Sequence, residues 1–380
     1  MFAKLILDHA NQTNLPAWRR SRRIHPSGGA SGACTRHSHH FVATRILFRL
    51  PTLIRSKAGS LFLVYSGGRE SHVCPFGRVD LMRSHDDGKT WSWPETLMDS
   101  AIDDRDAGIC ETASGALLVT TFTSLTYESR KKNLTAEQQT RWDAVDRRLT
   151  AAQRQELQDT WMLRSSDAGL TWSAPFRVPL NSPHGPVLVS GGRLLYAGKK
   201  VWDAEGKVGV SESSDDGKTW HWLSDVPVRP GDHAKEYHEL HAVQAANNSI
   251  ILHIRNHNPQ NNGETLQCES VDNGRTWTVP RAIGVWGLPS HLLRLRDGRL
   301  LMTYGYRRPP FGNQARISTN HGQTWSEPMT LSDDAISVDV GYPSTVELEN
   351  GSLVTVWYET LKSSPKAVLR QATWRLETPA

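Results

Sequence analysis

One eight-residue pattern, Ser-x-Asp-x-Gly-x-Thr-Trp, occurs five times in this 380-residue chain and restricts its fold more than any other feature. In a tight turn, an Asp or Asn side chain accepts backbone N–H bonds, and Gly adopts the positive φ that other residues avoid. The Thr and Trp are expected to begin a strand and to bury the indole against a neighbouring sheet. Five copies predict a repeat fold of similar β-units. They begin at Ser84, Ser165, Ser213, Ser270 and Ser318, and the last has Asn320 in place of the Asp.

A second pattern alternates with the first: a turn residue followed by an apolar, β-prone run, as in Gly59-Ser-Leu-Phe-Leu-Val. This is the signal of a β-hairpin. Six hairpins and five octets, at a spacing of about fifty residues, describe six units of roughly four strands each. The sequence therefore predicts an all-β chain folded as a six-bladed β-propeller. The six turn residues are Gly59, Gly115, Gly192, Asn248, Gly298 and Gly351.

Two of the six units depart from the average. The last begins at Gly351, has no octet and is followed by only 29 residues. We expect residues 41–50 to supply its missing strand, because that would close the ring and remove an open sheet edge. The second unit is longer, and its extra stretch, residues 128–160, is rich in Ala, Gln, Glu and Arg. These residues favour helix, so a short helical insertion in the second blade is predicted.

The first forty residues differ in character from the rest. The net charge is +5, and the Arg-rich stretch 19–23 holds much of the excess. A charge run of this kind is typical of a solvated tail, so we expect residues 1–40 to be disordered, residues 41–380 to form the propeller, and nucleic acid not to be a partner. The apolar stretch 2–7 is too short for a signal peptide and contains Lys4, which makes the cytoplasm the expected location. A misplaced start would leave a secreted or periplasmic location open.

The sequence contains neither a long apolar run nor a metal-binding cysteine motif, which argues against a membrane protein and against a zinc protein. No apolar run reaches eighteen residues, so the sequence predicts no membrane span. The four cysteines show neither CxxC spacing nor a zinc-like pairing with His, and we expect free thiols or small core residues. No metal site and no cofactor is therefore predicted. The cysteines are Cys34, Cys74, Cys110 and Cys268.

The octet resembles the Asp box of the sialidase (neuraminidase) superfamily, and the resemblance, that of a divergent branch, runs from about residue 44 to about residue 375. In that family a triad of arginines grips the carboxylate of the substrate. The matching positions are Arg49 in Phe-Arg-Leu-Pro, Arg255 in Ile-Arg-Asn, and either Arg307 or Arg308 in Tyr-Arg-Arg-Pro, while Arg69 in Gly-Arg-Glu matches a further pocket arginine.

The catalytic pair of the family also has matching positions. Glu239 in His-Glu-Leu matches the catalytic glutamate, and Tyr342 in Gly-Tyr-Pro matches the nucleophilic tyrosine. The residue types suit a sialic acid, whose carboxylate on the anomeric carbon would repel a carboxylate nucleophile but not a neutral phenol. A phenol titrates at about 10, so it needs a neighbouring base. Three guanidinium groups can hold the carboxylate through paired, charge-assisted hydrogen bonds.

The proton donor of the family has no counterpart at its usual place. It is an aspartate in the loop that follows the Arg69 element, and residues 70–78 contain no Asp. Glu70, His72 and the acidic cluster 103–106 are possible substitutes, and we take Asp104 as the candidate. Without a donor, activity toward poor leaving groups is expected to fall by about 10²- to 10⁴-fold.

The resemblance implies a retaining, metal-free exo-glycosidase that removes terminal sialic acid or a related acidic sugar from glycans. Two alternatives stay open because the acid is missing: hydrolysis of a different sugar, such as a uronic acid, and sugar binding without catalysis. The candidate residues also have structural alternatives. These are ion pairing for Arg49, Arg69 and Arg255, packing for Tyr342, and an ion pair or, less favoured, a metal site for Glu239 among His233, His238 and His241. His184 and His291 are weaker candidates for the lining of the funnel.

Overall fold

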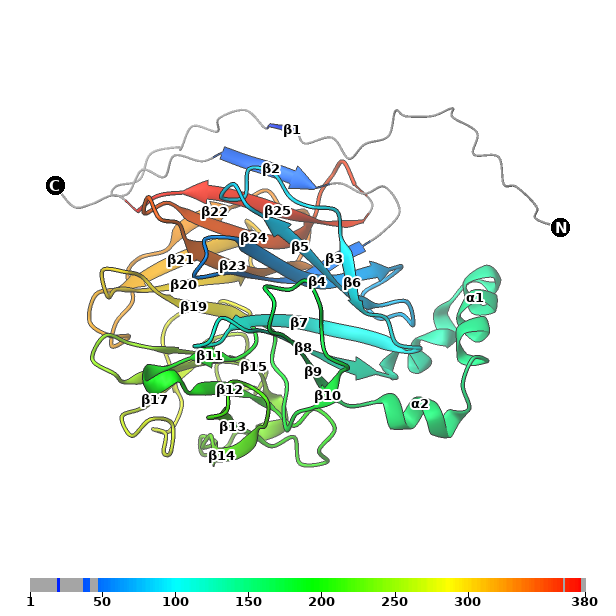
Figure 1. The fold of residues 1–380 in the computed structure, drawn as a ribbon, viewed down its shortest axis with the longest axis horizontal. Helices are drawn as coiled ribbons and strands as arrows, with labels where there is room; N and C mark the ends of the chain where they lie inside the picture. Colours follow the sequence, from blue (N-terminus) through cyan, green and yellow to red (C-terminus); the bar gives the residue numbers. More distant parts are fainter. Residues whose placement is uncertain (1–18, 21–36, 42–46, 365, 377–380) are drawn as a thin grey trace.

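The computed structural model describes residues 19–20, 37–41, 47–364 and 366–376. They form six antiparallel sheets, and each sheet follows the chain outward from an innermost strand. The inner strands of neighbouring sheets contact one another around a central channel. The predicted six-bladed β-propeller is confirmed, and Figure 1 shows the chain passing from blade to blade in sequence order.

The strands of the six blades have the following bounds. The first blade contains β3 (Leu47–Arg55), β4 (Leu61–Arg69), β5 (Arg78–Ser84) and β6 (Glu95–Met98), and the second contains β7 (Asp103–Glu111), β8 (Leu117–Ser124), β9 (Thr160–Ser165) and β10 (Phe176–Arg177). The third contains β11 (Val187–Leu188), β12 (Leu194–Lys199), β13 (Val208–Ser213) and β14 (His221–Asp225), and the fourth contains β15 (Tyr237–Gln244), β16 (Ile250–Asn256), β17 (Thr265–Ser270) and β18 (Arg281–Ala282). The fifth contains β19 (Ser290–Arg294), β20 (Leu300–Tyr306), β21 (Gly312–Ser318) and β22 (Met329–Ser332), and the sixth contains β23 (Val340–Glu347), β24 (Leu353–Thr360), β25 (Ala367–Trp374), β2 (His37–Phe41) and β1 (Arg19–Arg20). Two single turns of 3₁₀ helix, η2 (Ser190–Gly192) and η3 (Ala234–Glu236), lie between strands.

Apolar side chains fill the spaces between the blades in six clusters, one for each pair of neighbouring blades. The Trp of each octet packs into the cluster between its own blade and the preceding one. Trp277 of the fourth blade also donates from Nε1 to Ser224 of the third at 3.1 Å. Trp91 of the first blade donates to Gln371 of the sixth at 3.0 Å. The octet therefore joins blades as well as turning the chain, as expected for a buried indole.

Side-chain hydrogen bonds hold each octet in its turn. In the first copy, Asp86 Oδ1 accepts the backbone N–H of Thr90 at 2.9 Å. In the last copy, Asn320 Oδ1 accepts the N–H of Thr324 at 3.0 Å. The amide thus replaces the carboxylate without loss of the turn, because the turn needs only an oxygen acceptor at this position.

The N-terminal segment closes the ring, but with other residues than those expected. β2 pairs antiparallel with β25 and completes the sixth blade, and the two strands lie side by side in Figure 1. The prediction that residues 41–50 form this strand was wrong. Residue 41 ends β2, whereas residues 47–50 open β3, because the hairpin at Gly59 needs a first strand of its own. The expected boundary at residue 40 falls inside β2, and most of residues 1–40 lie outside the described part of the chain.

The helical insertion in the second blade is confirmed between β8 and β9. It consists of η1 (Thr126–Asn133), α1 (Ala136–Asp146) and α2 (Ala151–Leu157), and it projects from the side of the propeller in Figure 1. Thr135 and Thr150 begin the two α-helices with capping boxes. Trp142 of α1 is buried against Val73 and Cys74 in the loop after β4. The insertion therefore supports that loop.

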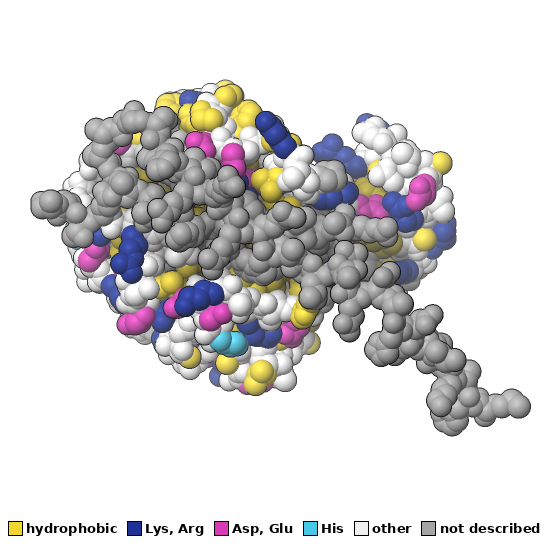
Figure 2. Space-filling model, turned by 90° about the horizontal axis from the view of Figure 1, so that it is seen from above, with side chains coloured by type: hydrophobic (Ala, Val, Ile, Leu, Met, Phe, Trp, Pro, Cys, Tyr) yellow, Lys and Arg dark blue, Asp and Glu magenta, His cyan; other side chains and the backbone are white. Residues whose placement is uncertain are grey.

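The described surface carries charges of both signs. In Figure 2, Lys and Arg side chains lie among Asp and Glu side chains. Some of them form ion pairs, such as Arg193, just before β12, with Glu212 of β13 at 2.7 Å. None of the helices in the described part of the chain combines the length and the apolar composition that crossing a bilayer requires. Three of the cysteines are described, and Cys74, Cys110 and Cys268 are buried free thiols, as expected.

The octet glycines give a test of the packing between blades. Gly217 has φ 81°, and a Cβ there would lie 2.4 Å from Leu118 Cδ1 of the preceding blade. Gly351, at a hairpin turn, has φ 74° and no neighbour within 4 Å of such a Cβ. We expect Gly351→Ala to destabilise the protein by about 1–2 kcal/mol, the cost of a left-handed conformation. Gly217→Ala should cost a further ~1–3 kcal/mol, because Leu118 must move. Urea unfolding of both variants measures the difference, and equal losses would show that the interblade contact is loose.

Candidate active site

Four of the six innermost strands carry the same irregularity near their start. In β3, β7, β15 and β23, two residues oppose a single residue on the neighbouring strand, so that one residue is extra. In β15 the interruption lies between His238, which pairs with Arg255, and His241, which pairs with His253. A β-bulge of this kind turns a side chain out of the regular alternation and is common beside active sites.

One residue of each bulge has a positive φ, which side chains other than glycine rarely adopt. The values are 56° at Leu50, 51° at Asp106, 45° at Glu239 and 53° at Tyr342. Such strained backbone costs about 1–3 kcal/mol and persists where the surrounding structure enforces it, often at functional sites. Because the four bulges are equivalent, they present four side chains at one level of the channel, and three of these are polar.

Glu239 and Tyr342 meet in the channel from the fourth and sixth blades. The Tyr342 hydroxyl donates to Glu239 Oε1. Arg255 Nη1 donates to Glu239 Oε2 at 2.5 Å and to Tyr342 Oη at 3.0 Å. The Nε of Arg255 donates to His257 Nε2 at 2.7 Å, which holds the guanidinium in this orientation. The structure thus brings the phenol, the carboxylate and one guanidinium into a single hydrogen-bonded group.

Burial and charge set the protonation of this group. Burial raises the pKa of Tyr342 well above its ordinary value, and the negative charge of Glu239 adds to the shift. Burial acts on Glu239 in the same direction, but the charge of Arg255 and the hydrogen bond from Tyr342 outweigh it and hold the pKa of Glu239 below its ordinary value. The pair therefore rests as a neutral phenol and a carboxylate, and the carboxylate can take the phenolic proton.

Two more arginines flank this group through a pair of tyrosine rings. The ring centroids of Tyr342 and Tyr358 are 5.8 Å apart. Arg49 Cζ lies 5.2 Å from the centroid of Tyr358, and Arg307 Cζ lies 5.9 Å from that of Tyr342. Together with Arg255, three guanidinium groups from three blades surround the two adjoining rings.

Fixed acceptors hold both flanking arginines in place. Asp339 Oδ1 accepts from Arg49 Nη1 at 2.5 Å and from the Tyr358 hydroxyl at 2.9 Å. The backbone carbonyl of Val340 accepts from Arg307 Nε at 3.1 Å. Guanidinium groups held in this way lose little further freedom when they bind an anion.

Arg308 and Arg69 lie apart from this group. Arg308 is exposed, and its Cζ lies 4.4 Å from the ring centroid of Trp286. Of the two adjacent arginines, Arg307 is therefore the one beside Tyr342. Arg69 is buried and donates to Asp103 Oδ1 at 2.5 Å and to the backbone carbonyl of Asp104 at 2.8 Å. It joins the first blade to the second.

Asp104, the candidate acid from the sequence, has no hydrogen bond to the Tyr342 phenol in the described part of the chain. Its side chain is completely buried, and Oδ2 accepts the backbone N–H of Ser100 at 2.7 Å. Burial raises the pKa of Asp104 to about 8. Regular alternation along β7 would give Asp104 and Asp106 the same direction, but the register shift after Arg105 and the positive φ of Asp106 break that alternation.

The other two substitutes lie in the loop after β4. Glu70 accepts from Arg141 Nε at 3.1 Å and from Trp142 Nε1 at 3.2 Å, so its carboxylate is tied to α1. His72 Nε2 lies 3.5 Å from Arg105 Nη2. Desolvation and the charges of the neighbouring arginines lower the pKa of His72 to about 3, so its ring is neutral at ordinary pH.

Sequence reasoning missed the individual importance of Arg105 and Asp106, which it held only as members of an acidic cluster. A signal for Asp106 was present in the spacing. Leu50, Asp106, Glu239 and Tyr342 each stand nine positions before the turn residue of their hairpin, at Gly59, Gly115, Asn248 and Gly351. No comparable signal marks Asp339 or Tyr358, which only the pairing of β23 with β24 brings to the site.

Three residues at the rim could offer ligand atoms to a metal ion. Donor atoms of Glu236, His238 and His257 lie within 4.8 Å of one another. Their surroundings oppose a cation. His257 Nε2 already accepts a hydrogen bond from Arg255 Nε, and the positive charges of Lys199 and Arg255 act on His238. We therefore describe this group as a polar wall of the site.

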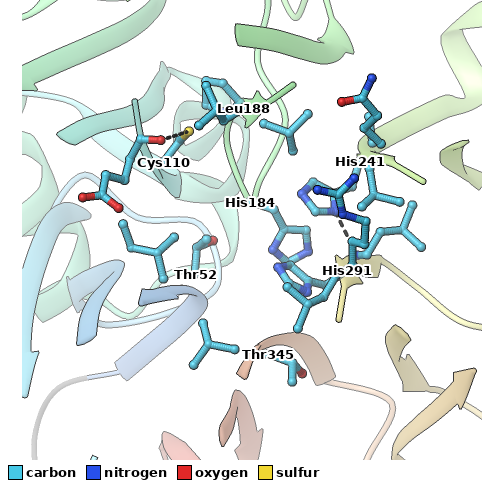
Figure 3. Close-up of a pocket in the computed structure, with 18 of the residues that line it drawn as sticks. Thr52, Cys110, His184, Leu188, His241, His291 and Thr345 are labelled. Carbon is cyan, nitrogen blue, oxygen red and sulfur yellow. Dashed lines mark hydrogen bonds between the residues drawn. The ribbon is translucent and has the colours of Figure 1, made fainter. Parts of the chain in front are cut away.

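Three histidines line the channel further along the inner strands. The ring centroids of His184, His241 and His291 are 4.8–5.1 Å apart. Figure 3 shows the three together beside a cavity of about 590 Å³ that Thr52 and Thr345 also border. Burial lowers the pKa of His291 to about 3, and those of the other two well below their ordinary value. The three imidazoles themselves are therefore neutral, whereas arginine and glutamate side chains, such as Arg294 and Glu347, line other parts of the same cavity.

The three neutral histidines predict a loss of stability in acid. Their folded pKa values lie below the unfolded value of about 6.5, so they leave stability unchanged above pH ~6.5 and reduce it as the pH falls from there toward 3. Each contributes about 1.4 kcal/mol per pH unit in that window. The free energy of unfolding from urea titrations at pH 7, 6 and 5 measures the slope. His291→Gln should make the slope shallower by about one histidine's share, and an unchanged slope would contradict the burial of a neutral ring.

Comparisons with known proteins identify the family and the fold. Residues 148–355 match the family described as a BNR repeat-like domain. Among solved structures, a protein of unknown function from Dyadobacter fermentans superposes with a TM-score of 0.72 at 21% identity, over 88% of this chain and 96% of that one. The Hadza microbial sialidase Hz136 superposes with a TM-score of 0.64 at 19% identity, over 86% of this chain and 65% of that one. At these identities the likeness establishes the sialidase-like fold.

One curated relative is similar in sequence. A xyloglucanase from Paenibacillus is 28% identical over 226 residues, which span 49% of this chain and 20% of the xyloglucanase. The match thus covers about a fifth of that relative.

Proposed function

Because the chain belongs to the family of BNR repeat-like proteins and has the sialidase-like propeller fold, we propose that it is a glycoside hydrolase that removes a terminal, carboxylate-bearing sugar. Sialic acid is the proposed sugar, and the reaction is a retaining hydrolysis with Tyr342 as nucleophile and Glu239 as its base. The proposed chemistry uses no metal ion and no cofactor.

One observation carries the proposal: the hydroxyl of Tyr342 donates to the carboxylate of Glu239 while Arg255 contacts both. A tyrosine that only packed would not need a buried carboxylate as its partner, since an uncompensated buried charge is costly. Here the guanidinium compensates the carboxylate in the resting state. When the phenol gives up its proton to Glu239, the same guanidinium stabilises the phenolate. Arg255 can therefore stabilise the negative charge on either residue.

The arginines match the anionic part of the substrate. Arg49, Arg255 and Arg307 come from three different blades and face one region, which suits the two oxygens of a carboxylate. An aromatic rim suits the sugar that leaves. Trp202 is 39% exposed, and its ring centroid lies 6.1 Å from that of Phe122. Exposed indoles stack on sugar rings through their apolar faces.

A second candidate keeps the same chemistry and changes the sugar to a uronic acid. The arginines contact a carboxylate and do not by themselves select the ring that bears it. The loop after β4 favours this candidate, because it lacks the usual acid and is held by the helical insertion. Parallel assays with aryl sialosides and aryl uronides separate the two, and turnover of one class alone decides between them.

Removal of the phenolic oxygen tests the nucleophile. Tyr342→Phe should lower kcat on an aryl sialoside by more than ~10³-fold, because no atom remains to form the covalent intermediate. The measurement is the release of the phenol at saturating substrate, with the melting temperature as a control for folding. Turnover by the variant equal to that of the parent protein would eliminate Tyr342 as the nucleophile.

The adjacent pair Arg307 and Arg308 offers a matched test of carboxylate binding. Arg307→Ala should raise KM, or the Kd of a sialic-acid analogue, by about 10- to 100-fold through the loss of a charge-assisted hydrogen bond. Arg308→Ala should change either constant by less than about twofold, because its guanidinium lies over Trp286 at the exposed rim. Isothermal titration with the analogue measures both variants. The reverse order of effects would assign the carboxylate to Arg308.

A further inference from the structure

The proposed reaction needs a proton donor for the oxygen of the leaving group, and the inference made here depends on that proposed function. Tyr342 and Glu239 act on the anomeric carbon, and neither can also protonate the departing oxygen in the same step, because Glu239 receives the phenolic proton. In the loop that follows β4, the carboxylate of Glu70 accepts a hydrogen bond from Trp142 of α1, and the ring of His72 is neutral. The donor must therefore come from another part of the channel.

Three of the four bulges place a polar side chain in the channel, and two of the three are Glu239 and Tyr342. The third is Asp106 of β7, which has the same positive φ, the same register and the same distance from its hairpin turn. Equivalent backbone directs the three side chains toward the same part of the channel. We propose that Asp106 is the general acid that protonates the leaving oxygen.

The surroundings of Asp106 suit a carboxyl group that carries a proton. The residue is 8% exposed, and its buried Oδ1 has no hydrogen-bond partner among the described residues. Its backbone N–H is anchored by Ser66 Oγ of the first blade at 3.1 Å. Burial raises the pKa of Asp106 to about 6; Arg105 opposes the shift, and the charge of Glu239 adds to it. The carboxyl group is thus protonated in mildly acidic solution and remains a strong enough acid to donate.

The acid and the catalytic pair influence one another electrostatically. The charge of Asp106 is among those that raise the pKa of Tyr342, after burial and Glu239. Two ionised carboxylates this close to one phenol would oppose its deprotonation. The pair works best with Asp106 neutral and Glu239 charged, a division of pKa values typical of an acid and a base in one site.

The position of Asp106 also faces the side on which a leaving sugar would lie. Its neighbour Arg105 has Cζ 5.8 Å from the ring centroid of Phe122, and Phe122 contacts the exposed Trp202. These residues form a continuous path from the bulge of β7 to the aromatic rim. A sugar stacked on Trp202 would therefore have its linking oxygen on the Asp106 side of the reacting carbon.

The proposed step balances in atoms and electrons. The Tyr342 oxygen forms a bond to the anomeric carbon as its proton passes to Glu239, and the bond from that carbon to the leaving oxygen breaks. The leaving oxygen takes the proton of Asp106. In the second half, the Asp106 carboxylate accepts a proton from water, the water oxygen replaces Tyr342 on carbon, and Glu239 returns its proton to the phenol.

The role of Asp106 as the acid can be tested by comparing the activity of one variant on substrates with a poor and a good leaving group. Asp106→Asn should lower kcat/KM on an alkyl sialoside, a poor leaving group, by about 10²- to 10⁴-fold. On a nitrophenyl sialoside, which leaves without protonation, the loss should stay below about tenfold. The parent protein's rate on the alkyl sialoside should fall as the pH rises through about 6, because the acid ionises, and the variant should lose this dependence. Both substrates are assayed on one preparation, so a partly unfolded variant does not alter the ratio.

His72→Gln serves as the matched control, and its ratio between the two substrates should equal that of the parent protein. Equal losses on both substrates with Asp106→Asn would overturn the acid and leave Asp106 as a binding residue, with the proposed function intact. A changed ratio with His72→Gln alone would assign the acid to His72. If the parent protein turned over neither the nitrophenyl nor the alkyl sialoside, the proposed function and the acid would both be overturned.

Discussion

The bulge that recurs in four inner strands is the constraint on which the site depends. A regular strand alternates its side chains between two faces. In a propeller built from regular strands, each inner strand would therefore direct only every second side chain into the channel. The extra residue of the bulge, which has a positive φ, interrupts this alternation and gives one side chain on each bulged strand a different direction. The interblade clusters hold the strands on both sides of each bulge, and they supply the energy that keeps a Glu, an Asp and a Tyr in a conformation these residues rarely adopt.

The charges at the mouth follow from the same geometry. Three of the four bulges carry a polar side chain, and a buried charge is stable only with a partner. Glu239 has Arg255, Asp339 has Arg49, and Asp103 has Arg69, which locks two blades together. Further along the channel the partners are absent and the polar residues are neutral imidazoles. The ion pairs of the site are thus followed, along the channel, by three buried and neutral imidazoles.

The fold could be predicted from the sequence because its signals are local and repeated. Each octet carries its own turn chemistry and its own Trp, and six hairpin turns count the blades. Ring closure was predicted with the wrong residues, since pairing between β2 and β25 depends on contacts more than 300 positions apart that no local pattern marks. In the site, motifs named Arg49, Arg255, Glu239 and Tyr342, and the structure brings these four side chains to one end of the channel. Asp104 was chosen from a cluster of acidic residues, and such a cluster does not reveal which member stands at the bulge. Asp339 and Tyr358 belong to no motif.

The proposed acid and the proposed substrate would reinforce each other. Near the phenol, Arg49, Arg255, Arg307 and Arg105 stand against the carboxylates of Glu239, Asp339 and Asp106. With Asp106 protonated, the arginines exceed the charged carboxylates by two, and a substrate carboxylate finds unneutralised guanidinium groups. Its own charge then opposes ionisation of Asp106 and raises that pKa further. Binding of an acidic sugar would therefore favour the protonated form of Asp106, which is the form that can donate to the departing oxygen. A neutral sugar in the same channel would leave the pKa of Asp106 closer to its value in the free protein.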